Sequence, residues 1–227
     1  NLAVRSWLIN AGTRTILVDT CIGNHKERPR WPTWHQRSSD GYLRALSAAG
    51  VSPEAVDIVF CTHLHADHVG WNTTLRDGRW VPTFKNARTL VGRADYLHYE
   101  ALATDDKHGA FADSVAPIME HGLMDLVDDG YDLGPGLTLT ASPGHSPGHM
   151  CLEAPGGIFA GDAIHSPFQL ADPTIACAFD TDAALAIATR LALLERVAES
   201  GVLLIPTHFP ARGRARIARH GHGFRAL

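Results

Sequence analysis

The sequence lacks several features that would assign it to a particular class of protein. It has only four cysteines, which are Cys21, Cys61, Cys151 and Cys177. Their spacing shows no pairs and two of them lie inside apolar runs, which favours free thiols in a reducing compartment. No apolar run approaches the roughly 20 residues that a membrane-spanning helix needs. The formal net charge is -4 and the pI is about 6.4, so the basic excess typical of nucleic-acid binding is missing. We therefore expect a cytoplasmic protein with neither nucleic-acid nor membrane partners, although the start at Asn1 without Met leaves an export signal open.

The rest of the composition is that of an ordinary globular protein. Hydrophobic residues make up 45% and charged residues 19% of the chain, and we find no internal repeat. The 227 residues fit one domain, 1–227. Basic residues cluster near the end, where a solvated face is the favoured interpretation: Arg212, Arg214, Arg216 and Arg219. His220 and His222 lie beside glycines, in a segment that fits a closing strand better than a metal site.

Periodicity and turn residues predict several elements. Apolar runs at 3–9 and 13–18 flank Asn10-Ala11-Gly12, which predicts a hairpin. Asp40 predicts the cap of a helix that runs to Ala49. Further helices are expected at 93–102, 111–120 and, most clearly, 181–200. The expected inward stripe of the last helix is Leu185, Ala188, Leu191, Leu194 and Val197.

The densest chemistry lies in the stretch THLHADH at 62–68, directly after the apolar run 56–61. It carries four metal-ligand side chains within six positions: His63, His65, Asp67 and His68. Imidazole and carboxylate suit zinc, manganese, cobalt and iron. In an extended turn alternate side chains share a face, so His63 and His65 can bind one ion while Asp67 and His68 bind another. The spacing therefore predicts two metal ions.

Three other apolar, strand-like runs each deliver a ligand type at the carboxyl end. The run 137–141 leads to His145, 158–160 leads to Asp162, and 202–205 leads to His208. Sites in layered α/β proteins lie outside the carboxyl ends of strands. We therefore expect the four strand ends to converge on one rim.

In this order, His-Leu-His-Ala-Asp-His, Pro-Gly-His-Ser-Pro-Gly-His, Gly-Asp and Pro-Thr-His resemble the motifs of the metallo-β-lactamase superfamily of metallohydrolases. The resemblance covers nearly the whole chain. It implies an α/β fold, an αβ/βα four-layer sandwich of two mixed β-sheets flanked by helices. The motifs are specific for fold and metal site and say little about substrate.

The resemblance also implies the role of each motif residue. One ion would be held by His63, His65 and His145, and the other by Asp67, His68 and His208. Asp162 would bridge both ions together with a hydroxide. The expected cofactors are two divalent ions, Zn²⁺ by preference, with Mn, Co or Fe as alternatives. His149, in the same motif as His145, is more often structural in this superfamily than a ligand.

Three further roles follow from the resemblance. Asp19 would orient a ligand histidine, and an Asx turn that closes a strand is the equal alternative. Asp67 would also relay a proton to the leaving oxygen. His165, where lactonase-like members carry a tyrosine or histidine, would hydrogen-bond the substrate oxygen or assist proton transfer, and a satisfied core histidine is the alternative.

Substrate selectivity is expected in the loops. Trp31 and Trp34 either roof a substrate pocket or pack onto the domain. The excursion around 71–125 is expected to be a lid or insertion region. Its apolar side chains would form a lid or a homodimer contact: Trp71, Trp80, Phe84, Phe111 and Met119.

The predicted function is hydrolysis of an ester-type bond, preferably a lactone, by attack of the bridging hydroxide. The segment Gly-Asp-Ala-Ile-His at 161–165 resembles the lactonase and organophosphate-hydrolase branch. The substrate would be a small, neutral and partly apolar molecule. Phosphotriester, thioester and β-lactam hydrolysis at the same site are alternatives. An iron-dependent dioxygenase and a non-catalytic, metal-stabilised binding module are alternatives from other classes.

Overall fold

The computed structural model describes residues 3–103, 109–210 and 213–227. The chain forms two compact units. The N-terminal unit comprises Arg5–Val91 and Tyr96–Leu126, and the C-terminal unit comprises Asn1–Val4, Gly92–Asp95 and Val127–Leu227. The prediction of a single domain stays a prediction.

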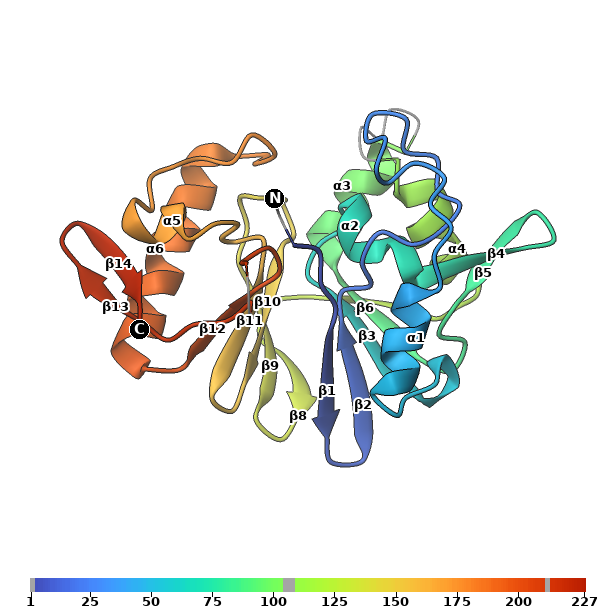
Figure 1. The fold of residues 1–227 in the computed structure, drawn as a ribbon, viewed down its shortest axis with the longest axis horizontal. Helices are drawn as coiled ribbons and strands as arrows, with labels where there is room; N and C mark the ends of the chain where they lie inside the picture. Colours follow the sequence, from blue (N-terminus) through green and yellow to red (C-terminus); the bar gives the residue numbers. More distant parts are fainter. Residues whose placement is uncertain (1–2, 104–108, 211–212) are drawn as a thin grey trace. The chain divides into compact units, whose positions relative to one another are not determined.

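The N-terminal unit is built on a five-stranded sheet with the order β1-β2-β3-β6-β7 (Figure 1). The predicted hairpin is confirmed, because β1 pairs antiparallel with β2 around Gly12, which has a φ of 71°. Strands β2, β3 and β6 then run parallel. All four residues of β3 are buried, as expected for an internal parallel strand. The strands are β1 (Trp7–Ala11), β2 (Arg14–Val18), β3 (Ile58–Cys61), β6 (Arg88–Gly92) and β7 (Met124–Val127).

Short helices and one hairpin complete this part of the chain. They are α1 (Gly41–Ala48), η1 (Pro53–Ala55), α2 (Ala66–Val69), η2 (Gly70–Asn72), β4 (Thr73–Arg76), β5 (Arg79–Pro82), α3 (Arg93–Ala101), η3 (Phe111–Val115) and α4 (Ala116–Glu120). The predicted helices at 41–49 and 93–102 are confirmed to within one residue. The helix predicted at 111–120 consists of a π-helical turn followed by α4. Asp40 occupies the predicted cap position, but its side chain makes no capping hydrogen bond.

The core of the N-terminal unit joins helices to the sheet. Leu46 of α1 and Tyr96 of α3 belong to the same buried cluster as Val59 of β3 and Val91 of β6. The strand end that carries His63 is therefore anchored to a packed scaffold.

The C-terminal unit has its own mixed sheet, with the order β12-β11-β10-β9-β8 (Figure 1). The pairings are antiparallel except that of β11 with β12, which is parallel. Its elements are β8 (Tyr131–Gly134), β9 (Leu137–Ala141), β10 (Met150–Ala154), β11 (Gly157–Gly161), α5 (Phe168–Ala171), α6 (Ala183–Ser200), β12 (Leu203–Pro206), β13 (Ile217–His220) and β14 (Gly223–Ala226). Two mixed sheets with helices confirm the predicted α/β class.

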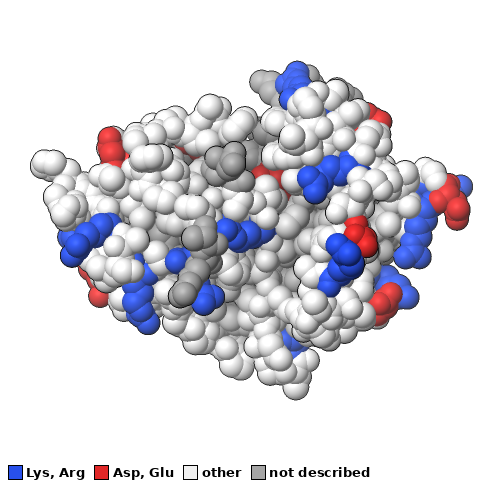
Figure 2. All heavy atoms as spheres, in the orientation of Figure 1, with Lys and Arg blue, Asp and Glu red and all other residues white. Residues whose placement is uncertain are grey.

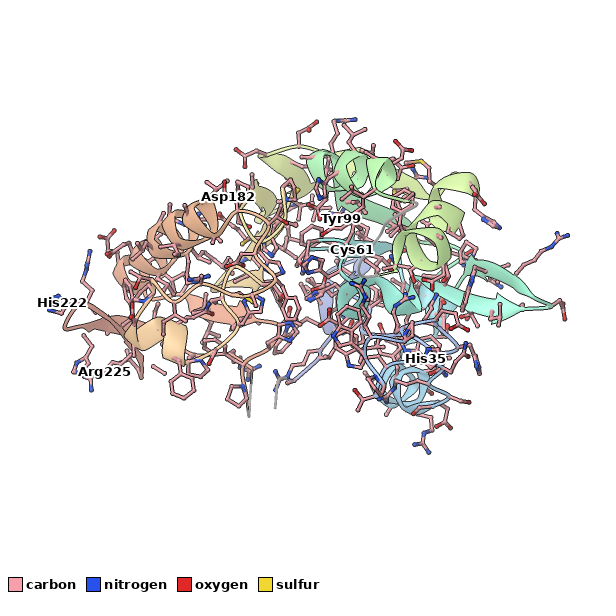
Figure 3. The ribbon with its side chains drawn as sticks, turned by 90° about the horizontal axis from the view of Figure 1, so that it is seen from above. His35, Cys61, Tyr99, Asp182, His222 and Arg225 are labelled. Atoms are coloured by element: carbon pink, nitrogen blue, oxygen red, sulfur yellow. The ribbon has the colours of Figure 1, made fainter. Side chains whose placement is uncertain are left out.

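Helix α6 forms where the sequence predicts it, but its buried stripe differs. Asp182, labelled in Figure 3, caps the helix, because its side chain accepts a hydrogen bond from the Leu185 amide at 3.0 Å. Gly201 ends the helix with a φ of 68°. Leu185 is 42% exposed and Ala188 is also exposed, so the predicted stripe is wrong at these positions. Alanines lie on several faces of this helix, so the faces differ little in hydropathy and packing determines which side is buried. The buried residues are Ala186, Arg190, Leu193, Leu194 and Val197.

The tail folds as the hairpin β13–β14 rather than as a single closing strand. Arg214, Arg216 and Arg219 are exposed, as predicted, and Arg219 pairs with Glu195. Arg212 lies outside the described residues. Figure 2 shows basic side chains on the visible surface with acidic ones nearby. None of the described helices is both long enough and apolar enough to cross a membrane.

Candidate metal centre

The first ligand set lies at the carboxyl end of β3 and the start of α2, in the N-terminal unit. His65 is extended, with a φ of -69° and a ψ of 155°, and the helix begins at Ala66. The His63 ring lies 4.5 Å from the His65 ring and 4.0 Å from the His68 ring, between centroids. All four side chains are buried, with exposures of 0% for His63, 4% for His65, 8% for Asp67 and 0% for His68. One turn therefore gathers the four predicted ligands of this unit.

Asp19 orients this set. Its Oδ2 atom lies 2.8 Å from Nδ1 of His68, and its Oδ1 atom accepts a hydrogen bond from the Thr62 amide at 2.8 Å. Asp19 is fully buried and has a φ of 58°, a region that non-glycine residues rarely adopt. A carboxylate on Nδ1 leaves Nε2 of His68 as the ligand atom. Of the two interpretations of Asp19, the orienting role fits these contacts.

Several residues that the motifs did not predict hold the turn in place. Thr20 donates its hydroxyl to Oδ1 of Asn72 at 2.8 Å, and its amide donates to the His68 carbonyl at 2.6 Å. Gly70 packs so closely that a Cβ there would lie 1.9 Å from the carbonyl carbon of Ile22. These contacts join positions about 50 apart, so local patterns carry no signal for them.

The second ligand set belongs to the C-terminal unit and converges on one carboxylate oxygen. Oδ2 of Asp162 lies 3.4 Å from Nε2 of His145, 3.1 Å from Nε2 of His208 and 3.1 Å from Nε2 of His165. The four side chains are between 2% and 7% exposed. They follow β9, β11 and β12, so three of the four predicted strand ends deliver their ligands within this unit.

Oxygen acceptors hold the opposite nitrogen of two of these ligands. Nδ1 of His145 lies 2.9 Å from Oδ1 of Asp180, and Nδ1 of His208 lies 2.6 Å from the Ala3 carbonyl oxygen. Burial lowers the pKa of His145 below its ordinary value, against the opposing effect of Asp180, so the imidazole favours the neutral form that a metal needs. Burial alone would raise the pKa of Asp180, but hydrogen bonds from His145 and the Cys177 amide bring it below its ordinary value.

His149 is not arranged as a ligand. Its Nδ1 atom lies 2.6 Å from the Ser142 hydroxyl, and its Nε2 atom accepts a hydrogen bond from the Asp162 amide at 3.0 Å. Both ring nitrogens thus have hydrogen-bond partners, and Nε2 positions the backbone that carries Asp162. This agrees with the structural role that the resemblance implies.

His165 contacts two reactive side chains. Besides Asp162, its Nε2 atom faces the Cys177 sulfur at 3.6 Å, while Nδ1 has no hydrogen-bond partner among the described residues. Burial lowers the pKa of His165, but the Asp162 carboxylate outweighs burial and raises that pKa to about 10. A core histidine with all its hydrogen bonds satisfied is therefore the wrong interpretation.

The predicted roof and lid residues are largely packed inside the N-terminal unit. Trp71 stacks on Tyr42 with a centroid distance of 5.4 Å and is 5% exposed, and Phe84 and Phe111 are 3% and 7% exposed. These three side chains therefore do not supply surface for a lid or a dimer contact. Trp34 stacks with Trp31 at 5.5 Å and packs against the hydrophobic core.

Aromatic support for the first ligand set comes from α3. The ring of Tyr99, labelled in Figure 3, lies edge-on to His65 with a centroid distance of 6.0 Å and is 5% exposed. A buried tyrosine in this position restricts the orientation of the imidazole.

Curated relatives of this chain include lactonases. An N-acyl homoserine lactonase from Bacillus cereus is 27% identical over 206 residues, which cover 84% of this chain and 76% of the relative. The N-acyl homoserine lactonase AttM from Azorhizobium caulinodans is 34% identical over 127 residues, which cover 53% of this chain and 43% of the relative.

Solved structures share the fold. The hydrolase AbOPH of the β-lactamase superfamily has a TM-score of 0.83 at 25% identity, with 100% of this chain and 79% of that chain covered. The dizinc quorum-quenching lactonase AidC, in complex with a product, has a TM-score of 0.80 at 20% identity with the same coverage. The fold predicted from the motifs is thus confirmed.

The family assignment rests on a match that covers most of the sequence. The protein-family model described as the metallo-beta-lactamase superfamily matches residues 1–208 of this chain. This range includes all seven predicted metal ligands, the whole N-terminal unit and the C-terminal unit up to His208. The chain belongs to the metallo-β-lactamase superfamily.

Proposed function

We propose that this protein is a metal-dependent hydrolase that opens the lactone ring of N-acyl homoserine lactones. The relatives of the chain support the substrate class, since several are named as lactonases of this kind. The observation that carries the chemistry is the convergence of three imidazole nitrogens on one oxygen of Asp162, at 3.1 to 3.4 Å. A carboxylate in that environment suits a bridging metal ligand.

We propose that seven residues hold two divalent ions, Zn²⁺ by preference. One ion takes His63, His65 and His145, the other takes Asp67, His68 and His208, and Asp162 is shared. The donor set fits, because imidazole and carboxylate are zinc ligands and because His68, His145 and His208 each have Nδ1 held by an oxygen acceptor. Divalent ions bound here would lower the pKa of a coordinated water from about 15.7 toward neutrality and would polarise the substrate carbonyl.

The chain's own residues would then handle protons and orientation. His165 lies beside Asp162. The substrate carbonyl oxygen would develop negative charge next to that carboxylate, and His165 would donate a hydrogen bond to this oxygen. Asp67 is buried beside His68, with 3.7 Å between its Oδ2 and Nε2 of His68, and would carry a proton to the leaving oxygen. Asp19 and Asp180 keep two ligand imidazoles in place.

The substrate would be small, neutral and partly apolar. In the C-terminal unit, the segment that supplies Cys177 and Asp180 also exposes apolar side chains: Phe168 at 78%, Ile175 at 44% and Phe179 at 49%. Gln169 connects this segment to His165, because its Oε1 accepts from the His165 amide at 2.8 Å and its Nε2 donates to the Ile175 carbonyl at 3.0 Å. Exposed apolar surface tied to His165 suits the acyl chain of such a lactone.

Location and assembly are parts of this proposal. All four thiols are free, which supports the reducing conditions of the cytoplasm. A homodimer is proposed as well, and size measurement in solution would test it.

An acid-release assay in a pH-stat tests the reaction class. Metal-loaded protein would be offered N-hexanoyl homoserine lactone, a thioester, a phosphotriester and a β-lactam in turn. Asp162→Ala is the inactive comparison, and Asp128→Ala, which removes an exposed carboxylate paired with Arg93, is the matched control. Acid release from the lactone that only Asp162→Ala abolishes is the expected result. Release from another ester class alone would replace the lactonase proposal.

A further inference from the structure

The thiol of Cys177 has no role in the proposed chemistry, yet it lies beside the imidazole of His165, close to the proposed metal ligands. The sulfur of Cys177 lies 3.6 Å from Nε2 of His165. These two donor atoms and a ring nitrogen of His145 all lie within 4.8 Å of one another. Cys177 is partly exposed and has exposed neighbours on both sides, Ala176 and Ala178, so ions in solution have access to it.

The spacing fits a metal ion. Zinc bonds sulfur at about 2.3 Å and imidazole nitrogen at about 2.0–2.1 Å, so a tetrahedral angle places the two donors about 3.5–3.6 Å apart. The observed separation of 3.6 Å between sulfur and nitrogen matches this edge. His165 is only 7% exposed, and its Nδ1 atom has no hydrogen-bond partner among the described residues, so no contact to Nδ1 fixes the ring against a small rotation toward an ion.

Backbone hydrogen bonds hold Cys177 and His165 in position. The Cys177 amide donates to Oδ2 of Asp180 at 2.8 Å, and the His165 amide donates to the Gln169 side chain at 2.8 Å. Arg190, which is fully buried, donates to the carbonyls of Pro173 and Ile175 at 2.8 Å and fixes the segment before Cys177. A preformed pair of this kind loses little conformational freedom when it binds an ion.

We propose that Cys177 and His165, with His145 as third donor, form a binding site for soft divalent ions such as Cd²⁺ or excess Zn²⁺, and that occupation of this site inhibits the enzyme. Thiolate prefers such ions to Mg²⁺ or Ca²⁺. On binding, the Cys177 thiol releases its proton to solvent and the sulfur forms the bond to the ion, with no change in oxidation state. Since His145 also belongs to the proposed ligand set, an ion here competes for that ligand and removes His165 from the substrate.

The ion-binding part of this proposal does not depend on the lactonase assignment, so a spectroscopic test separates the two. Zinc-loaded protein, freed of excess zinc, would be titrated with Cd²⁺ while the ultraviolet thiolate-to-cadmium charge-transfer absorption is recorded. We expect the absorption in the wild-type protein, its loss in Cys177→Ser and its strong reduction in His165→Gln. Cys151→Ser, which replaces a buried thiol in β10, is the matched control and should retain it.

Two outcomes overturn the proposal. One is the absence of thiolate absorption from the wild-type protein or its persistence in Cys177→Ser. The other is a Cys177→Ser variant that changes the pH profile of hydrolysis but not Cd²⁺ binding, which would make Cys177 a positioning residue for His165. Inhibition gives the second readout: Cys177→Ser should need at least about tenfold more Cd²⁺ for half-inhibition, since even outer-shell losses cost about 10- to 100-fold in metal affinity.

Discussion

Nδ1 of His145 lies 2.9 Å from Oδ1 of Asp180, a residue 35 positions later in the chain. Asp180 is held in turn by the Cys177 amide at 2.8 Å and lies 3.8 Å from Arg190. The carboxylate therefore sets the ring orientation and tautomer of His145 and directs Nε2 toward Asp162.

Replacing Asp180 should weaken metal binding. Asp180→Ala removes the acceptor that orients His145, so we expect a loss of about 10- to 100-fold in affinity for the ion that His145 is proposed to hold. Competition with a chelating dye measures this loss. Asp128→Ala, which removes an exposed carboxylate paired with Arg93, is the control and should bind metal as the wild-type protein does. Unchanged metal affinity in Asp180→Ala would contradict the role of Asp180 in orienting His145.

Asp19 should affect stability and metal binding separately. Asp19→Ala leaves the buried Thr62 amide without its acceptor and places alanine at a φ of 58°, so we expect about 1–3 kcal/mol of lost stability. Asp19→Asn keeps an acceptor and tolerates that φ, so it should lose less stability but still bind metal more weakly, because the charge facing His68 is gone. Denaturant unfolding and metal competition on both variants test this; equal stability losses would contradict it.

The N-terminal unit contains a buried ionic cluster that should dominate the stability of its loop 21–39. Asp113 accepts two hydrogen bonds from Arg28, at 2.8 and 2.9 Å, and lies 3.6 Å from Nζ of Lys26. Asp113→Ala leaves the buried guanidinium of Arg28 without its charge partner and should cost about 3–5 kcal/mol. Asp125→Ala removes an exposed pair with Arg88 and should cost at most about 1 kcal/mol in denaturant unfolding. Similar costs for the two variants would show that the cluster is not a stabilising feature.

Lys26 should make stability depend on pH. Burial lowers its pKa to about 7, against the opposing charge of Asp113. The unfolded chain, with the ordinary pKa of 10.5, then binds more protons than the folded chain between about pH 7 and 10.5, so the contribution of Lys26 to stability rises with pH across that range. Because thiols and tyrosines titrate there too, the test is the difference between wild type and Lys26→Met at pH 7 and pH 9. A difference that does not change with pH would contradict the lowered pKa.

The sequence predicts which strand ends and which turn carry the candidate ligand side chains, because these signals are local. His63, His65, Asp67 and His68 share one turn, and His145, Asp162 and His208 each follow an apolar run that forms a strand. The structure also places Asp19 beside His68, as one of its two interpretations required.

The parts that sequence reasoning missed depend on contacts between distant segments. Asp180 and Asp113 find their partners 35 and 85 positions away, and no local pattern marks either. Arg190 lies in an alanine-rich helix, and hydropathy predicts that its charged side chain faces solvent. It is buried instead, because its guanidinium donates hydrogen bonds to three backbone carbonyls. Trp71 was expected at a lid or dimer contact, but it packs on Tyr42 inside the unit.

The most direct test of the central claim is the fate of oxygen from the solvent. Metal-loaded protein would be incubated with N-hexanoyl homoserine lactone in ¹⁸O-labelled water, and the product would be analysed by mass spectrometry. We predict ring-opened N-hexanoyl homoserine with one labelled oxygen in its carboxylate, formed by the wild-type protein and not by Asp162→Ala. An intact lactone after incubation with fully metallated wild-type protein would contradict the account.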